Sequence, residues 1–343
     1  MKSSLRYACS AALIGVGLTA ARPASAQIGT INSAFYHPRE FNDVPGSTLT
    51  VVGNYPSLIS FQDQNVSAAA GFANRHVWRF SSDSGVSPYT FSNNDFFTVS
   101  MTVTLTGDPA SPRKEAGFLL DTIGGQGQFE VNTDGHEVVA FGGPFPFYAF
   151  PATFQSGDTV TLGITYFLDS LGKRAVIYSA NCMHSPPLEF SNLEQGIIDG
   201  STLGGYFQIV NAPTVATNSG IAVFQNIKIG PPDQDLDGAP DAVDQCPETP
   251  PCAIVDVSGC IALGLACTSG AECASTFCVD GVCCNGPCSN PGQSCNLPGS
   301  AGVCRAEISG VPAASQWGIV ILCVLLAAVG VASLISVRYR MRS

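Results

Sequence analysis

The chain has 343 residues, of which 45% are hydrophobic and 12% are charged, and its formal net charge is −11. Such an acidic surface repels phosphate groups, which excludes nucleic acid as a partner and suits a soluble protein that meets cations. The chain also contains 14 cysteines, a number typical of a disulfide-bonded protein in an oxidising compartment.

Residues 1–26 have the pattern of a secretory signal peptide. Two basic residues precede an apolar stretch over residues 8–20, and Ala24-Ser25-Ala26 is the small-x-small pattern that signal peptidase accepts. The alternative, an N-terminal helix of the folded protein, is opposed by Arg22-Pro23, which would break the helix. We therefore predict export, with Gln27 as the first mature residue.

Residues 27–230 alternate apolar and polar side chains, as strands with one buried face do. The alternation is clearest over residues 97–105, 160–166 and 221–229. Turn-forming residues, such as those of 169–172, separate these stretches, and no segment of any length has a helical period. The region therefore predicts an all-β fold, an antiparallel β-sandwich whose core is large enough to form without disulfides.

The order of the strand patterns resembles a concanavalin-like jelly roll, as found in laminin G domains and legume lectins. The matching segments are residues 115–121, 128–132, 204–209 and 223–229. This resemblance implies a sandwich of a class that binds glycans in many proteins and hydrolyses them in a few, so the fold alone does not decide the function.

No catalytic constellation is evident in this region. A retaining glycosidase needs two carboxylates about 5 Å apart, and no such pair stands on one strand face. The four histidines lack metal-ligand spacing, so each is expected to be a surface or partly buried structural residue, and Trp78 fits core packing. We therefore predict that the protein is not an enzyme. The aromatic loop 144–150 is either a sugar-binding surface or a loop that folds back over the core.

Residues 233–246 gather five aspartates, a glycine and a cysteine at the spacing of a calcium loop. An acidic linker is the alternative, and an EF-hand is disfavoured because prolines precede the loop and lie inside it. In loop order, the predicted Ca²⁺ ligands are Asp233, Asp235, Asp237, the backbone carbonyl of Ala239, Asp241 (directly or through water) and Asp244.

Residues 231–260 resemble a thrombospondin type 3 repeat, whose pattern D-x-D-x-D-G-x-x-D-x-x-D-x-C-P they match. The resemblance implies a calcium ion that serves architecture, and a Cys246–Cys260 pair. Cys252 is then the candidate partner of Cys182, which is the single cysteine of the sandwich region. A buried free thiol is the alternative for Cys182.

Residues 261–306 hold eight cysteines between Cys267 and Cys304. So short a segment cannot bury a useful core, so disulfides must stabilise it. The adjacent Cys283 and Cys284 are expected to join different partners. Zinc is the alternative, although paired C-x2-C knuckles and histidines are missing. The segment resembles Asp-Gly-Val-Cys-Cys modules of secreted bacterial proteins and, loosely, the Dickkopf cysteine-rich domain, which implies a spacer or protein-contact module.

For the last 37 residues, the sequence predicts a linker over 307–316, a transmembrane helix over 317–337 and a basic cytoplasmic tail over 338–343. They resemble the bacterial IPTL-CTERM sorting signal, through Val311-Pro312, Trp317-Gly318, the apolar run and the terminal arginines. Ala313-Ala314 replace the Thr-Leu of that motif. The resemblance implies an exosortase-type processing enzyme as a partner; without processing, the helix is a single-pass anchor.

Without the two end segments, the chain has nine basic and 26 acidic residues, which gives a net charge of −17. Together the parts predict an exported, envelope-anchored, non-catalytic protein that displays a β-sandwich binding or adhesion head on a calcium-stabilised, disulfide-rich stalk. The ligand of the head would be a glycan or a surface protein. The alternatives are a glycan-degrading enzyme on the same sandwich and a purely structural envelope or matrix component.

Overall fold

The computed structural model describes residues 28–67, 71–190, 198–210 and 218–306. The chain divides after Pro232 into two compact units, which we call the sandwich and the cysteine-rich unit. In the described part of the chain, no helix is long and apolar enough to cross a membrane. The predicted signal peptide over 1–26 and the predicted sorting motif, transmembrane helix and tail over 307–343 lie outside the described residues.

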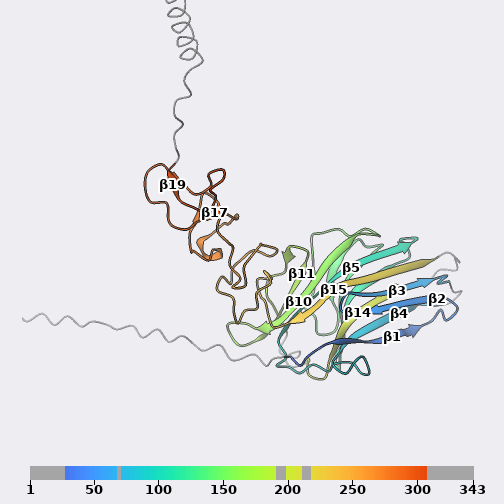
Figure 1. The fold of residues 1–343 in the computed structure, drawn as a ribbon. Coiled ribbons are helices and arrows are strands. Elements are labelled where there is room, and N and C mark those ends of the chain that lie inside the picture. The colour runs from blue at the N-terminus through green and yellow to red at the C-terminus, as the bar shows by residue number, and fades with distance from the viewer. Residues whose placement is uncertain (1–27, 68–70, 191–197, 211–217, 307–343) are drawn as a thin grey trace, which may run out of the picture. The chain divides into compact units, whose positions relative to one another are not determined.

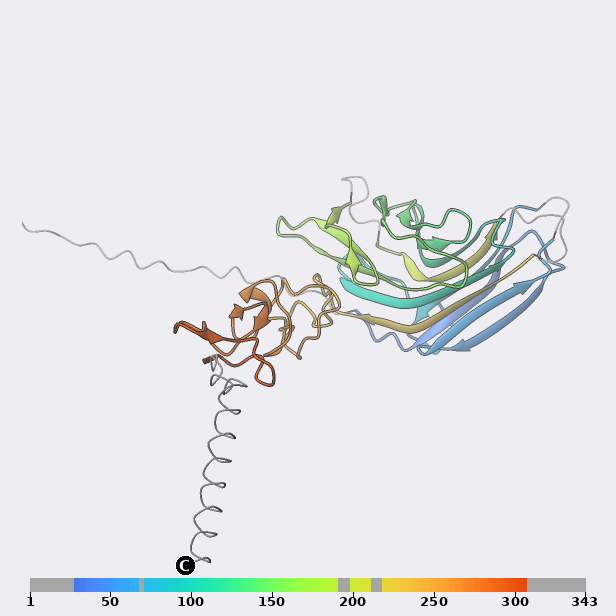
Figure 2. The same cartoon turned by 90° about the horizontal axis from the view of Figure 1, so that it is seen from above.

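The sandwich consists of two antiparallel sheets (Figure 1), and Figure 2 shows that its long strands are curved. The seven-stranded sheet has the order β1 (Ser33–Asn42), β4 (Ala73–Ser81), β14 (Thr202–Val210), β6 (Lys114–Thr122), β7 (Gly125–Asn132), β8 (Val138–Phe141), β9 (Tyr148–Ala149). The other sheet has the order β12 (Met183–His184), β11 (Arg174–Ala180), β10 (Thr159–Leu168), β5 (Phe97–Asp108), β15 (Ser219–Gly230), β3 (Leu58–Gln64), β2 (Thr48–Asn54), with β13 (Leu188–Glu189) also paired to β11. The predicted all-β antiparallel sandwich is confirmed.

Strand β5 shows why the sequence pattern gives this fold. Its apolar side chains from Phe97 to Leu105 are buried in the core, while the residues between them point outward. On the outer face, the hydroxyl groups of Thr104 and Thr159 lie 2.7 Å apart across the β5–β10 pair. Such cross-strand pairs stabilise a sheet whose other face is buried.

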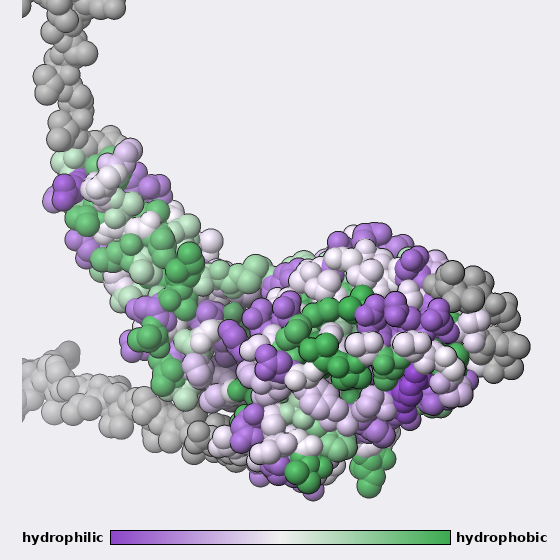
Figure 3. Space-filling model, turned by 45° about the vertical axis from the view of Figure 1, so that its right-hand side comes forward, coloured by the Kyte–Doolittle hydropathy of each residue, from purple (hydrophilic) through white to green (hydrophobic). Residues whose placement is uncertain are grey.

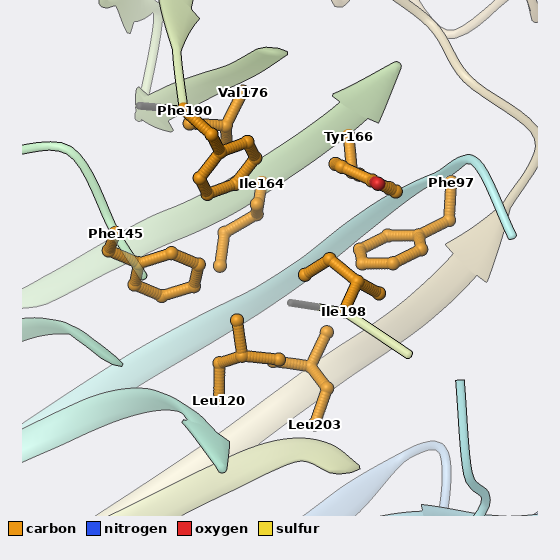
Figure 4. A pocket seen from close by; sticks show the side chains of 9 residues that line it. All are labelled: Phe97, Leu120, Phe145, Ile164, Tyr166, Val176, Phe190, Ile198 and Leu203. Atoms are coloured by element: carbon orange, nitrogen blue, oxygen red, sulfur yellow. The ribbon is translucent and has the colours of Figure 1, made fainter. Parts of the chain in front are cut away.

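The core between the sheets is rich in aromatic residues. Trp78 is fully buried, and its ring lies 5.2 Å from that of Phe80 and 6.1 Å from that of Phe224, both in edge-to-face geometry. The prediction that Trp78 belongs to the core is confirmed. At one end of the core, nine side chains surround a small apolar pocket, and the phenol oxygen of Tyr166 is the polar atom among them (Figure 4). This hydroxyl donates to the Asn93 carbonyl at 3.0 Å, so the pocket is part of the core packing.

The aromatic loop over residues 144–150 folds back over the core. Phe145 and Phe150 are buried, and the ring of Phe145 lies 5.6 Å from that of Tyr178. Phe147 is 71% exposed, so the loop leaves one aromatic ring outside and gives no continuous aromatic platform. On the face that Figure 3 presents, hydrophobic residues form patches bordered by hydrophilic ones.

The cysteine-rich unit has little regular structure and is held together by disulfides. It contains a short 3-10 turn (Gly270–Glu272) and two hairpins of two-residue strands, β16 (Cys278–Val279) with β17 (Val282–Cys283) and β18 (Gln293–Ser294) with β19 (Arg305–Ala306). The disulfides are Cys246–Cys260, Cys267–Cys278, Cys273–Cys283, Cys284–Cys295 and Cys288–Cys304.

These bonds confirm the predicted disulfide framework. Cys283 and Cys284 do join different partners, and the Cys246–Cys260 pair is present. The sulfurs that zinc would need are used in disulfides. Cys182 and Cys252 are also disulfide-bonded, so a free thiol at Cys182 is ruled out, and their pairing with each other stays a prediction.

Candidate functional site

A cluster of polar side chains lies on the outer face of the seven-stranded sheet. The residues of β4, β14, β6 and β7 that point into the core include Trp78, Phe207, Phe118 and Phe129. Their neighbours along each strand therefore point outward, and the strand register arranges them in rows across the sheet. These outward residues include Arg75, Val77, Arg79, Tyr206, Gln208, Glu115, Leu119, Asp121, Gln126, Gln128 and Glu130.

Two carboxylates of this cluster, Glu115 on β6 and Glu130 on β7, share one guanidinium. Arg113 lies just before β6 and donates from Nε to Glu115 Oε2 at 2.8 Å and from Nη2 to Glu130 Oε1 at 2.6 Å. Glu130 is fully buried, whereas the side chain of Arg113 is 27% exposed. Arg113 therefore forms the solvent side of this group.

The Glu115–Glu130 pair has more negative charge than Arg113 can balance. Burial first, and then the charge of Glu115, raise the pKa of Glu130 to about 8, against the opposing effects of Tyr206 and Arg113. Burial also raises the pKa of Glu115. The two carboxyl groups titrate together, so we expect them to hold one proton near neutral pH. A carboxyl group that keeps its proton at neutral pH is suited to general acid catalysis.

Tyr206 on β14 completes this group. Its hydroxyl donates to Glu130 Oε2, and burial raises the pKa of Tyr206 well above its usual value. The phenol is therefore a proton donor that holds Glu130 in place. Like Glu130, it is fully buried.

Arg75 on β4 fixes the other side of the face. It donates from Nε to Gln208 Oε1 and from Nη1 to Gln126 Oε1, the latter at 2.5 Å. Its guanidinium carbon lies 6.0 Å from the centre of the Tyr206 ring. The face thus carries two hydrogen-bonded groups that meet at the Tyr206 ring, and these bonds keep the side chains of each group in defined positions.

The prediction from the sequence concerned carboxylate pairs on one strand face, whereas Glu115 and Glu130 come from two neighbouring strands. Gly117 of β6 is opposite Glu130 of β7, and Glu115 is the next outward residue along β6. Both glutamates stand at outward positions of predicted strands, but only the register between the strands brings them together.

The histidines lie outside this cluster. His76 is fully buried on the core side of β4, between the rings of Phe61 and Phe207 at 5.8 Å each. Its Nε2 lies 3.0 Å from Asp63 Oδ2, and its Nδ1 accepts from the Arg39 amide at 3.1 Å. His76 is structural, as predicted, but it is completely buried, whereas a surface or partly buried position was expected.

The predicted calcium loop brings three of its carboxylates together. Asp233, Asp235 and Asp237 each offer an oxygen, and these oxygens lie within 4.8 Å of one another. Asp237 Oδ2 is buried and lacks a hydrogen-bond partner in the described ranges. A Cβ at Gly259 would overlap Asp244 Oδ1 and lie 3.0 Å from Asp237 Oδ2, so Asp244 approaches the same place.

The electrostatics of the loop fit a cation. Burial first, and then the charges of Asp237, Asp244 and Asp233, raise the pKa of Asp235 to about 7. Burial and the neighbouring carboxylates likewise raise the pKa of Asp237 to about 6, against a hydrogen bond from the Ala239 amide. Carboxylates that repel one another in this way would be relieved by a divalent cation.

Two predicted ligands are less clearly placed. Both carboxylate oxygens of Asp241 accept hydrogen bonds from Gln234. The backbone N–H of Gln234 donates to Oδ1 at 2.8 Å, and its side-chain amide donates to Oδ2. Ala239 is buried, and its amide donates to Asp237 Oδ1 at 2.7 Å. Asp241 does not belong to the group of three carboxylates, and the roles of Asp241 and of the Ala239 carbonyl as ligands stay predictions.

No protein-family model matches the chain, and no curated protein matches it. Among solved structures, alginate lyase A1-II', a member of polysaccharide lyase family 7, is similar with 13% identity and a TM-score of 0.36, covering 52% of this chain and 82% of that one. A Bacteroides ovatus mixed-linkage glucan GH16 protein is similar with 8% identity and a TM-score of 0.37, covering 57% and 93%. At these values the likeness concerns the fold.

The prediction of a non-catalytic protein is corrected. It rested on the absence of a carboxylate pair, and Glu115 and Glu130 form one. The similar structures also include alginate lyases and the GH16 protein, which are enzymes by their names.

Proposed function

We propose that the chain is an exported protein whose sandwich cleaves glycosidic bonds, with its active site on the outer face of the seven-stranded sheet. The observation that supports this most is Glu130, a fully buried carboxyl whose pKa is raised to about 8 beside Glu115. Strongly shifted pKa values cluster at active sites. Glu130 would protonate the leaving oxygen as the glycosidic C–O bond breaks. The Glu115 carboxylate would take a proton from the water molecule whose oxygen bonds to the sugar carbon.

Arg113 controls access in this mechanism. It contacts both carboxylates, so a glycan oxygen reaches Glu130 when the guanidinium moves aside. Asp134 and Glu137 offer alternative partners, since their carboxylate oxygens lie 3.9 Å and 3.8 Å from Arg113 Nη1. When a substrate binds, Arg113 would thus exchange Glu115 and Glu130 for Asp134 or Glu137. Its charge would therefore stay paired.

The test is to incubate the purified full chain with a panel of neutral and acidic polysaccharides and to measure cleavage as the release of reducing ends. Glu130→Gln keeps the shape of the side chain but removes the acid, so the rate should fall by about 100-fold or more. Glu189→Gln is the matched control. Glu189 lies on β13 of the other sheet, is exposed and forms an ion pair with Lys173. Failure of the wild-type chain to cleave any glycan of the panel would contradict the proposal.

We propose further that the loop over residues 233–244 binds Ca²⁺ through Asp233, Asp235, Asp237 and Asp244, with the Ala239 carbonyl and Asp241 as additional ligands. The close approach of the carboxylates and the buried, unpartnered Asp237 Oδ2 support this. The ion would supply charge balance and stiffness to the start of the cysteine-rich unit, because it ties together residues that otherwise repel one another.

Export and attachment to the cell envelope are also part of the proposal. They rest on the sequence patterns at the two ends of the chain. The disulfides of the cysteine-rich unit support an oxidising compartment. A membrane, an exosortase-type enzyme and a glycan are the partners that this reading implies.

A further inference from the structure

Arg79 on β4 has a buried donor without an acceptor, on the same sheet face as Glu115 and Glu130. Its side chain is 4% exposed, and in the described part of the chain its Nη1 has no hydrogen-bond partner. Its Nε donates to Thr202 Oγ1 at 3.2 Å. An N–H group that is buried without an acceptor costs free energy, which an oxygen placed beside it would recover.

The position of Arg79 puts this donor beside the proposed active site. Arg79 is opposite Gly204 on β14, and Tyr206 is the next outward residue along that strand. A side chain at Gly204 is excluded because its Cβ would overlap the carbonyl oxygen of Trp78. Outward neighbours on one strand are about 7 Å apart, so one short oligosaccharide would reach both Arg79 and the carboxylates near Tyr206.

The charges around Arg79 determine what kind of oxygen fits. Its Nη2 lies 3.5 Å from Glu40 Oε1 and 3.7 Å from Asp121 Oδ2. Glu40 Oε2 also lies 3.8 Å from Arg75 Nη1, so two carboxylates already balance the charges of two guanidiniums. A carboxylate, sulfate or phosphate of a ligand would add negative charge that no cation of this group is left to balance. A hydroxyl group instead accepts from Arg79 and donates to Glu40 or Asp121, whose side chains are 21% and 42% exposed.

We propose that Arg79, Glu40 and Asp121 form a subsite for a hydroxyl of an uncharged sugar, so that the glycan bound on this face is a neutral polysaccharide. The proposal rests on the function proposed above for the location of the substrate. It adds the substrate class and assigns Arg79 as the residue that selects it.

The experiment is affinity electrophoresis of the full chain in gels that contain a neutral β-glucan, a xylan or a polyuronate. We expect retardation by a neutral polymer and little by the polyuronate. Arg79→Lys keeps the charge but loses the donor fork, so binding of the neutral polymer should weaken about tenfold. Arg174→Lys is the matched control, because Arg174 donates from Nε to the Asn93 carbonyl at 3.2 Å on the other sheet.

Asp121→Asn is a second variant with less risk to folding, because Asp121 is the more exposed of the two carboxylates. Removing its charge should strengthen binding of the polyuronate. The melting temperature of Asp121→Asn should stay close to that of the wild type. Tighter binding of the polyuronate than of any neutral polymer by the wild type overturns the inference. So does unchanged binding by Arg79→Lys, which would mean that Nη1 holds a water molecule only.

The outcomes separate this inference from the proposed function. If the chain cleaves glycans through Glu130 and Arg79→Lys changes neither binding nor rate, the subsite is wrong and the function stands. If Arg79→Lys weakens binding while the wild type cleaves nothing, the subsite stands and the enzymatic function falls.

Discussion

Tyr206 and Glu130 meet over Gly117, the residue of β6 that pairs with both of them. Tyr206 is opposite Gly117 in the β14–β6 pair, Glu130 is opposite Gly117 in the β6–β7 pair, and the Tyr206 hydroxyl donates to Glu130. Because Gly117 has no side chain, the space above it is left to this hydrogen bond. A Cβ there would overlap the Phe129 carbonyl oxygen and lie 2.7 Å from Glu130 Cα.

Replacing this glycine should therefore damage both the sheet and the site. We expect Gly117→Ala to lower the free energy of unfolding by about 1–3 kcal/mol, the usual cost of inserting a methyl group into a packed region. Chemical denaturation measures this change. Gly46→Ala is the control, since no atom lies within 4 Å of the position of its Cβ. Equal stability of the two variants would show that β6 and β7 are not packed as described.

The stability of the sandwich should depend on pH through Glu130. Its pKa is raised from 4.5 to about 8 in the folded chain, so between these values the folded state holds a proton that the unfolded state has lost. The free energy of unfolding should therefore fall as the pH rises through this window, by up to about 1.4 kcal/mol per pH unit.

Denaturation curves between pH 5.5 and about pH 7.5 test this for the wild type and for Glu130→Gln. The variant cannot ionise at this position, so its stability should change less over the same range. Lys114 does not obscure the result, because burial lowers its pKa to about 8 from 10.5, which places its effect at higher pH. Identical pH profiles for the two proteins would disprove the assignment of the proton to this pair.

Calcium should stabilise the chain. After removal of bound ions by a chelator, titration with Ca²⁺ should release or absorb heat and raise resistance to proteolysis near residues 233–260. At 100 times the dissociation constant, the stabilisation would be about 2.7 kcal/mol. Asp235→Asn and Asp237→Asn should abolish the binding heat, while Asp169→Asn, in the turn between β10 and β11, should not. Equal heat from all proteins would contradict the calcium site.

The last prediction concerns Cys182 and Cys252. Both are disulfide-bonded, and we expect them to be bonded to each other, because the remaining cysteines of the described ranges have partners within the cysteine-rich unit. Peptide mapping by mass spectrometry without reduction should find a cross-linked peptide that contains both residues. The Cys246–Cys260 peptide serves as the internal control, and a Cys182 peptide linked to any other cysteine would disprove the pairing.

Much of the fold follows from local patterns. The alternation over residues 97–105 predicted β5, because a strand with one buried face needs an apolar residue at every second position. The same holds for the stretches that became β10 and β15. The adjacent Cys283 and Cys284 were correctly expected to join different partners, since the strain of a bridge between neighbours depends on local geometry alone.

The site could not be predicted in the same way. Glu115, Glu130, Arg79 and Tyr206 each stood at an ordinary outward position of a strand, and nothing in the spacing of any single strand marked them. Their chemistry depends on which strands are neighbours and on the register between them, both of which are properties of distant pairing.

The sequence by itself determined the class of fold, the disulfide-rich segment and the candidate calcium ligands, because strand alternation, cysteine density and loop spacing are short-range properties of the chain. Tertiary structure decided that β6 lies between β14 and β7, so that Gly117 brings Tyr206 and Glu130 together and Arg113 reaches both glutamates. Burial of these groups then sets their protonation, because the cost of a charge depends on everything packed around it.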